Sequence, residues 1–117
     1  MKKLQIEKPF QILDAWIPSR IALAVSVDTS RKPNIIPLGW SMVTSFDPPM
    51  VAISVGNCKG QFHRYSCELI ANSGEFVLAL PGEDLGQAVV YCGTHSGKDV
   101  DKFRETGLTP VPSSIVK

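Results

Sequence analysis

The hydrophobic and polar positions of the chain fall into short blocks that predict strands first and helices later. Residues 20–28 are rich in isoleucine, leucine, alanine and valine, which is typical of a buried strand. A polar cluster at 28–33 predicts a turn. The apolar pattern resumes over 34–46 and predicts a longer strand, which we expect to bend at Pro37 and Gly39.

The middle of the chain continues this succession of turns and regular elements. The Asp47-Pro48-Pro49 run predicts a sharp turn, because each proline fixes its own backbone and keeps the preceding residue extended. Residues 50–56 predict a third strand. Apolar side chains near helical spacing predict a helix over 60–72 that ends by Gly74, and residues 75–80 predict a fourth strand.

The last third is expected to hold two more helices and the start of a strand. Residues 83–91 open with two acidic side chains, which suit the positive end of a helix. Ser96 fits the start of a second helix that runs to Thr106 and stops at Gly107. Residues 111–116 predict a further strand. Strands in hairpin order with short helices indicate a mostly β, barrel-like or α+β fold, and without a GxGxxG run a Rossmann site has no support.

Composition and charge limit the class of protein and its partners. The chain has 117 residues, of which 44% are hydrophobic and 20% charged, as in one ordinary globular domain. The net charge is +1 and no basic run exceeds residues 1–3, so neither nucleic acid nor an anionic membrane is expected as the main partner. The apolar run at 21–25 is far shorter than the roughly 20 residues of a membrane helix. Glu7 and Asp14 interrupt any signal-peptide segment, and we expect a cytoplasmic protein.

The cysteines and histidines do not form a recognisable metal or disulfide pattern. Cys58, Cys67 and Cys92 are odd in number and lack CxxC spacing, so a disulfide framework is not expected. His63 and His95 are far apart and not near a cysteine pair, so no metal site is expected. Cys92 is most simply a buried apolar residue; a nucleophilic pair with His95 is the alternative, although no third, orienting group is evident.

Small and polar residues surround a tryptophan at the end of the long apolar block. Gly39, Trp40 and Ser41 stand side by side, which a strand buried only in a core would not need. A strand whose edge meets a flat polar ligand could use all three, because glycine lets a ligand approach the backbone. Ser54 and Gly56 repeat the combination one strand later. The alternatives are that Trp40 fills the core and that the serines face solvent.

A second constellation lies where the third predicted strand gives way to a helix. Its loop carries Lys59 and Arg64, and the start of a helix offers free N–H groups that bind phosphate. Arg64 could add a bidentate contact and Ser66 a hydroxyl; the alternative is that they are ordinary surface and helix residues. His95 and Ser96 precede another predicted helix, either as a simple cap with a neighbouring histidine or as contacts to a ring, a phosphate or an electron donor.

Four sequence blocks occur in the order in which a known family has them. The blocks are GWSMVTSFDPP, the strand MVAISVG that follows it, YSCELIANSGEF, and CGTHSGKDVDKFRETGL. In these blocks the chain resembles the flavin reductase-like, FMN-binding split-barrel family, which includes flavoredoxins and ferric reductase-like proteins. The resemblance spans roughly residues 34–117. No single block is diagnostic, whereas their order and spacing are fairly specific.

The resemblance implies a split β-barrel, with residues 1–117 as one flavin reductase-like domain. It implies noncovalent FMN, with FAD left open, and a homodimer with the site near the subunit interface. It also implies electron transfer from NAD(P)H through flavin to free flavin, ferric iron or a partner protein, with no catalytic acid or base because the flavin takes the hydride. Family members usually continue past the DKF helix through strands that close the barrel, so we expect a barrel incomplete at its C-terminus.

The resemblance further implies the positions that contact the cofactor. Beside the isoalloxazine ring it places Gly39, Trp40, Ser41 and Met42. Beside the ring and the ribityl chain it places Ser54, Val55 and Gly56. Near the phosphate it places Arg64, Tyr65 and Ser66, and near the ring or the nicotinamide it places His95 and Ser96. Two other functions stay open: a flavoredoxin-like electron carrier without NAD(P)H activity, and an interaction domain that binds no flavin.

Overall fold

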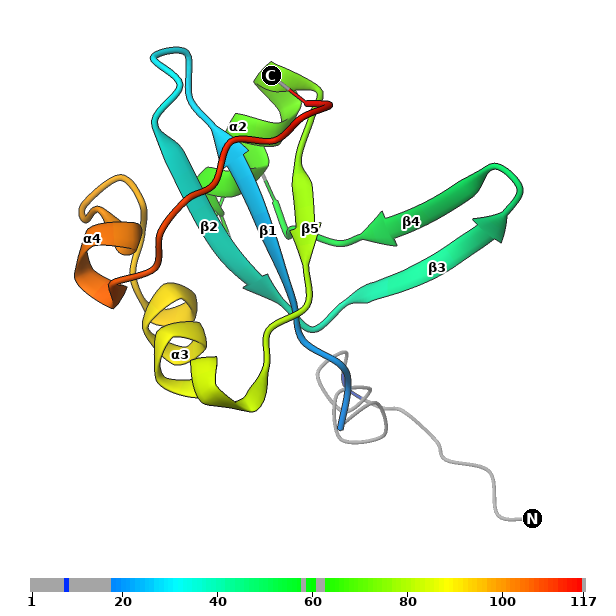
Figure 1. The fold of residues 1–117 in the computed structure, drawn as a ribbon, viewed down its shortest axis with the longest axis horizontal. Coiled ribbons are helices and arrows are strands. Elements are labelled where there is room, and N and C mark those ends of the chain that lie inside the picture. Colours follow the sequence, from blue (N-terminus) through cyan, green and yellow to red (C-terminus); the bar gives the residue numbers. More distant parts are fainter. Residues whose placement is uncertain (1–7, 9–17, 58, 61–62, 117) are drawn as a thin grey trace.

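The computed structural model describes residues 8, 18–57, 59–60 and 63–116. Figure 1 shows how the elements are arranged, and they follow one another in this order: β1 (Ala22–Val27), β2 (Pro33–Leu38), β3 (Ser41–Phe46), β4 (Pro49–Ile53), α2 (Tyr65–Ser73), β5 (Val77–Ala79), the 3-10 helix η1 (Glu83–Leu85), α3 (Gly86–Thr94) and α4 (Lys102–Thr106).

The described strands form two separate antiparallel sheets. The first has the order β2-β1-β5, and the second is the hairpin of β3 and β4, which extends to one side of the first sheet (Figure 1). β1 lies in the centre, and its side chains are buried along most of its length. In the register of the first sheet, Val25 lies opposite Ile35 on one side and Val77 on the other. β2 therefore keeps one edge free of strand partners within the described chain.

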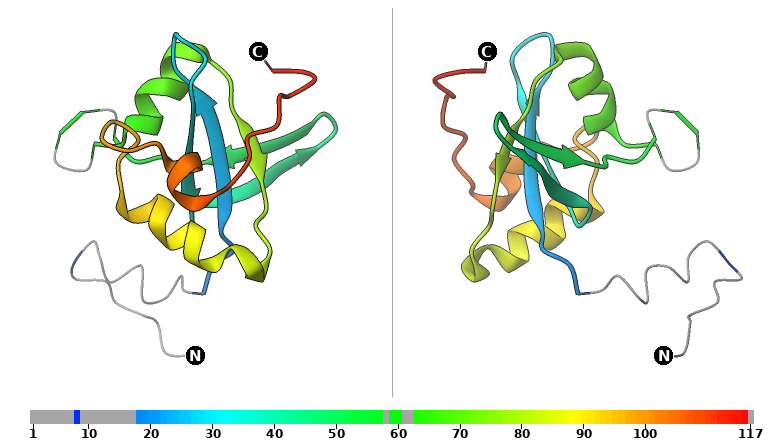
Figure 2. Two further views of the ribbon diagram at one scale, coloured as in Figure 1. Left: turned by 60° about the vertical axis from the view of Figure 1, so that its left-hand side comes forward. Right: turned by 90° about the vertical axis from the view of Figure 1, so that its right-hand side faces the viewer.

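Each face of the first sheet packs against its own set of apolar side chains. On one face, Leu23 and Ile35 contact Cys92 of α3 and Phe103 of α4, and Figure 2 shows these two helices beside the sheet. On the other face, Ala24 packs with a second set of side chains, which consists of Ile36, Leu38, Ile53, Val55, Phe76 and Leu78. Alternation along β1 and β2 produces both faces, as expected for strands buried on two sides.

The predicted strand over 34–46 is wrong as a single element, although its bend is correctly placed. β2 ends at Leu38, and the chain enters a different sheet at Ser41. Gly39 lies at the crossing, and a Cβ there would come within 3.2 Å of the Ser19 hydroxyl. Glycine thus allows the close approach that the change of direction requires.

The predicted helix starts are the least accurate part of the sequence analysis. The helix expected over 60–72 begins at Tyr65 and ends, as expected, at Gly74 with φ 71°. The helix expected from Ser96 begins only at Lys102. At Ser96 a single turn forms, in which the backbone N–H groups of Asp99 and Val100 donate to the Ser96 carbonyl. The side chain of Asp101 then caps α4 by accepting from the backbone N–H of Arg104 at 3.2 Å.

Other boundaries also differ from prediction. Residues 83–91 divide into η1 and the start of α3, which continues to Thr94. No strand forms over 111–116, where Pro112 cannot donate to a ladder and the Ser113 hydroxyl accepts from two following backbone N–H groups. The expected end of the last helix at Gly107, with φ 72°, is confirmed.

The structure bears on the disulfide and membrane-helix predictions. Cys67 is disulfide-bonded, which the odd cysteine count did not predict, whereas Cys92 is a free and buried thiol. Within the described part of the chain, no helix has the length and apolar character needed to cross a bilayer. Cys58, residues 61–62, and the N-terminal Glu7 and Asp14 lie outside the described residues.

Candidate functional site

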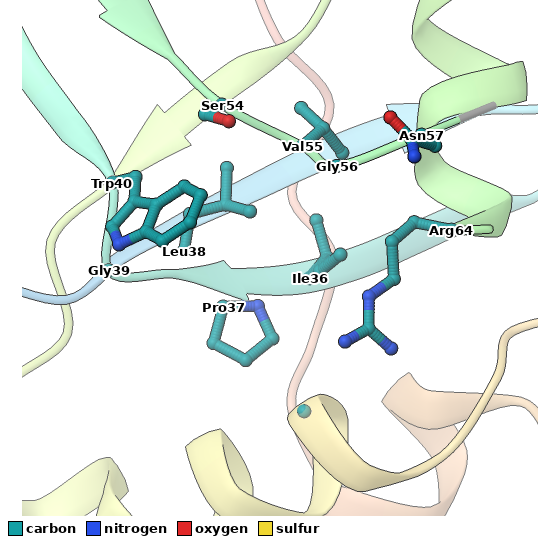
Figure 3. A pocket seen from close by; sticks show the side chains of 11 residues that line it. Ile36, Pro37, Leu38, Gly39, Trp40, Ser54, Val55, Gly56, Asn57 and Arg64 are labelled. Carbon is teal, nitrogen blue, oxygen red and sulfur yellow. The ribbon is translucent and has the colours of Figure 1, made fainter. Parts of the chain in front are cut away.

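A cavity of about 430 Å³ lies beside the free edge of β2 (Figure 3). It lies between β2, the segment that follows β4, the start of α2, and α3. Its lining consists of Ile36, Pro37, Leu38, Gly39, Trp40, Ser54, Val55, Gly56, Asn57, Arg64 and Gly93. Its volume is within the range of about 300–1,000 Å³ that small-molecule sites occupy.

The edge of β2 that meets the cavity is poor in N–H donors. The ammonium of Lys102 donates to the carbonyl oxygen of Ile35 at 2.9 Å, so that carbonyl points away from β1. Backbone groups alternate in direction along a strand, and Pro33 and Pro37 therefore face the same edge as Ile35. Proline has no N–H, which explains how two prolines are accommodated in this strand.

One end of the cavity is formed by the base of the β3–β4 hairpin. The Ser54 backbone N–H donates to the Trp40 carbonyl at 2.9 Å and closes that base. The Trp40 side chain is 53% exposed and lies along the cavity, so Trp40 is not the core residue that the alternative interpretation proposed. Together with Leu38 it offers a broad apolar surface at this end.

The opposite end is cationic. Arg64 is the N-cap residue of α2, and its guanidinium points into the cavity toward α3 (Figure 3). Its backbone N–H donates to the Asn57 carbonyl at 2.9 Å, which holds the start of α2 against the segment after β4. Gly56 turns that segment with φ 79°, a conformation in which glycine is favoured.

A smaller cavity of about 170 Å³ continues from this cationic end. It shares Ile36, Arg64 and Gly93 with the first cavity. The rest of its lining consists of His63, Tyr65, Ser66, Cys92, Thr94, His95, Ser96, Gly97 and Lys102. No aspartate or glutamate lines either cavity among the described residues, so the site carries positive charge without a carboxylate to offset it.

Lys102 is buried beside the smaller cavity. Its side chain belongs to a residue only 5% exposed, and its ammonium donates to the carbonyl oxygens of Ile35 at 2.9 Å and Cys92 at 2.8 Å. Burial lowers the pKa of Lys102, and the nearby charge of Arg64 lowers it further, while the Cys92 thiol raises it. Burial likewise raises the pKa of Cys92.

The two serines of the smaller cavity differ in their surroundings. Ser66 is 2% exposed, and its hydroxyl accepts a 2.8 Å hydrogen bond from the side-chain amide of Asn34. The Ser96 hydroxyl accepts from the backbone N–H of Lys98 at 3.2 Å in an exposed turn. His95 stacks on Tyr91 with ring centres 4.0 Å apart, so its ring lies along α3.

The structure gathers most of the predicted site residues and leaves two apart. The first cavity takes Gly39, Trp40, Ser54, Val55, Gly56 and Arg64, and the smaller one takes Arg64, Tyr65, Ser66, His95 and Ser96. Ser41 and Met42 lie on β3, outside both linings. Sequence reasoning missed Asn57 and Lys102. The DKF block contains Lys102, but nothing in its pattern indicated a buried ammonium.

Comparison with known proteins places this geometry in a family. The family model described as "Flavin reductase like domain" matches residues 14–117. An uncharacterized protein of Archaeoglobus fulgidus is 35% identical over 106 residues, which cover 91% of this chain and 56% of that protein. The chain thus spans little more than half the length of this relative.

Solved structures agree in fold. Flavoredoxin of Desulfovibrio vulgaris (Miyazaki F) superposes with a TM-score of 0.80 at 28% identity, over 99% of this chain and 58% of that one. An FMN-binding protein from Thermus thermophilus has a TM-score of 0.75 at 23% identity, over 89% of this chain and 55% of that one. These matches confirm the mostly β split-barrel fold. The chain belongs to the flavin reductase-like family of split-barrel domains.

Proposed function

We propose that this domain binds FMN noncovalently in the two joined cavities and serves an oxidoreductase that passes electrons through the flavin. The observation that carries the proposal is the polarity of the site. One end presents an exposed tryptophan and apolar strand residues. The other presents Arg64, the start of α2 and buried Lys102, with no carboxylate among the described residues that line it. A flavin nucleotide has the matching polarity, with a flat ring at one end and a phosphate at the other.

The residues present fit this cofactor group by group. We assign Gly39, Trp40 and the Ser54–Gly56 segment to the ring and the ribityl chain, because glycine backbone admits close approach there. Arg64, Tyr65 and Ser66 take the phosphate at the N-terminus of α2, where no side chain caps the helix. FAD remains the alternative flavin. Bound flavin would supply the ring that accepts two electrons.

The protein's own contribution is position and electrostatics. Trp40 shields one side of the ring site from water, and Arg64 fixes the far end of the ligand by charge. The Pro37 edge of β2 offers carbonyl acceptors but few N–H donors, which favours ring groups that donate. No side chain is assigned as a catalytic acid or base.

We assign NAD(P)H as the electron donor, and free flavin, ferric iron or a partner protein as the acceptor. The second candidate is an electron carrier without its own NAD(P)H activity. Similarity to a flavoredoxin over 99% of this chain favours that candidate. The two separate on one observation, which is whether NAD(P)H alone reduces the bound flavin.

The β3–β4 hairpin supports the proposal of a homodimer. It projects from the first sheet (Figure 1) and exposes a row of large apolar side chains, which are Met42, Val43, Phe46, Met50 and Val51. Phe46 is 93% exposed. Apolar surface of this kind marks an interface more often than a solvated face. A second copy that packs on the hairpin would also bring Met42 and Ser41 near a site.

The experiment that tests the proposed function is a titration with FMN followed by visible absorption and flavin fluorescence. Saturable binding that quenches or shifts the flavin signal supports it. A protein that stays colourless and does not change flavin fluorescence, even at high FMN, contradicts the proposal. The remaining candidate is then an interaction domain that binds no flavin.

A further inference from the structure

A cavity of about 520 Å³ lies apart from the two joined cavities, on the face of the first sheet that packs against α4. Val25 of β1, Val77 of β5 and Phe103 of α4 line one side of it. Figure 1 shows the segment over residues 109–116, in red, crossing in front of β1, and this crossing segment lines the other side. The cavity shares no lining residue with either of the two joined cavities, so it is a separate candidate site.

The crossing segment leaves this space open. Two of its apolar side chains are turned to solvent, since Val111 is 83% exposed and Ile115 is 89% exposed. The hydroxyl of Ser113, which lines the cavity, accepts from the backbone N–H groups of Ile115 and Val116 at 3.2 Å. These bonds do not use the hydroxyl proton, which remains available as a donor. A mostly apolar cavity of this volume, with a few polar groups, is typical of a small-molecule site.

The cavity also has a cationic group, the guanidinium of Arg31, which has no ion-pair partner within the described residues. Arg31 lies in the turn between β1 and β2 with φ 66°, a left-handed conformation that is uncommon for any residue other than glycine, asparagine or aspartate. The nearest acid of this turn, Asp28, accepts instead from the backbone N–H groups of Ser30 and Lys32. The turn thus keeps an unpaired arginine at a strained position, and such strain often marks a functional residue.

Glu75 lines the same cavity and limits the charge of its ligand. Its carboxylate is not free, because Glu75 takes part in an interaction of its own. One cation and one acid in the lining disfavour a dianion such as a phosphate monoester, since the acid repels the second charge. They leave room for a single carboxylate, which arginine binds through two parallel N–H bonds.

We propose that this cavity is a second ligand site, which takes a small monocarboxylate with an apolar body. Arg31 holds the carboxylate, and the body lies between the sheet and the crossing segment against Val77 and Phe103. The alternative occupant is the crossing segment itself, whose apolar side chains would settle into the cavity and close it. The proposal is independent of flavin binding, because the two sites have separate linings.

The experiment titrates the wild-type protein with cinnamate and with uncharged cinnamamide, which has the same apolar body, and measures Kd by calorimetry. Cinnamate should bind about tenfold more tightly than the amide, typical of one charge-assisted contact. Neither saturating FMN nor Trp40→Ala, which alters the flavin cavity, should change the affinity for cinnamate. Competition with FMN, or loss of binding in Trp40→Ala, would place cinnamate in the flavin cavity and overturn the proposal. Absence of binding by either probe also overturns it, because the crossing segment then closes the cavity.

Two variants assign the binding to this cavity. Arg31→Gly removes the guanidinium and suits the left-handed backbone, so it should keep or raise the thermal midpoint and lower the affinity for cinnamate to that for the amide. Arg104→Ala removes an exposed arginine elsewhere and should leave the affinity unchanged. Val77→Trp adds bulk inside the cavity and should abolish binding of both probes. Cinnamate that binds Arg31→Gly or Val77→Trp as tightly as wild type overturns the proposal.

Discussion

The side-chain amide of Asn34 donates a 2.8 Å hydrogen bond to the hydroxyl of Ser66, and this buried bond joins β2 to the first turn of α2. The other side of the Asn34 amide faces Gly97, where a Cβ would come within 2.1 Å of the amide oxygen. Asn34 therefore touches the two segments that enclose the smaller cavity. We therefore expect the packing around that cavity to be sensitive to a side chain added at Gly97.

Gly97→Ala should consequently destabilise the fold by about 1–3 kcal/mol, as expected when a methyl group is forced into a packed site. Gly86→Ala is the matched control, because no atom lies within 4 Å of its added Cβ and its backbone is right-handed helical. That control should be neutral or stabilising by about 0.4–1 kcal/mol. Chemical denaturation measures both. Equal stability of the two variants would contradict the close packing of Gly97 against Asn34.

Arg64→Ala should weaken FMN binding by about 1–3 kcal/mol, because it removes a charge-assisted contact from the cationic end of the site. Arg64 is exposed, so the fold should persist. Arg104→Ala, which removes an exposed arginine paired with its neighbour Glu105, is the control. Isothermal titration with FMN compares the three proteins. Unchanged affinity in Arg64→Ala excludes this residue from the site.

Trp40→Ala should alter the visible spectrum of bound flavin, since the indole lies along the ring end of the cavity. Trp40→Phe keeps an aromatic face and should retain most of the wild-type spectrum. Because the Trp40 side chain is half exposed, neither variant should change the thermal midpoint greatly. A spectrum in Trp40→Ala identical to that of wild type would place the ring elsewhere.

Phe46→Glu should convert the expected homodimer into a monomer, because it places a charge on the exposed apolar tip of the β3–β4 hairpin. Val111→Glu changes another highly exposed apolar residue, away from the hairpin, and is the control. Light scattering after size-exclusion chromatography reports the mass of each protein. A wild-type monomer, or a Phe46→Glu dimer, contradicts the proposed interface.

Cys92 should be unreactive in the folded protein. Burial raises the pKa of its thiol above the ordinary 9.0, so the folded state holds its proton at a pH where the unfolded chain releases it. The associated stability is complete below pH 9 and declines as pH rises further. Iodoacetamide at pH 8 should label Cys92 only after unfolding, and Cys92→Ser should keep flavin reduction. Rapid labelling of the native protein would instead support the interpretation of Cys92 and His95 as a nucleophilic pair.

How far the sequence predicts this structure depends on the kind of signal each element carries. β1 and the helix end at Gly107 follow from local pattern, because apolar runs and left-handed glycines act within a few residues. The division of 34–46 into two sheets does not follow, since a strand pattern is the same whichever partner it pairs with. The two prolines of β2 are compatible with an edge strand, but they indicate that position only once the strand order is known.

The candidate site shows the same division. That Arg64 and Ser66 lie near the beginning of a helix is predictable because the helix follows a strand closely in the sequence, although it begins at Tyr65 and not at residue 60. Lys102 is not predictable, because lysine side chains are normally exposed and its burial depends on carbonyl groups from residues as far away as Ile35. Ser41 and Met42 were assigned from resemblance, and their place on β3 leaves their role to the proposed second subunit.

The visible spectrum of the purified protein, recorded before and after addition of FMN and then after anaerobic addition of NADH, tests the central claim most directly. The account predicts flavin bands that persist through gel filtration and bleach with NADH. Bands that persist without bleaching would establish the carrier in place of the reductase. A protein that retains no flavin at all would contradict the account.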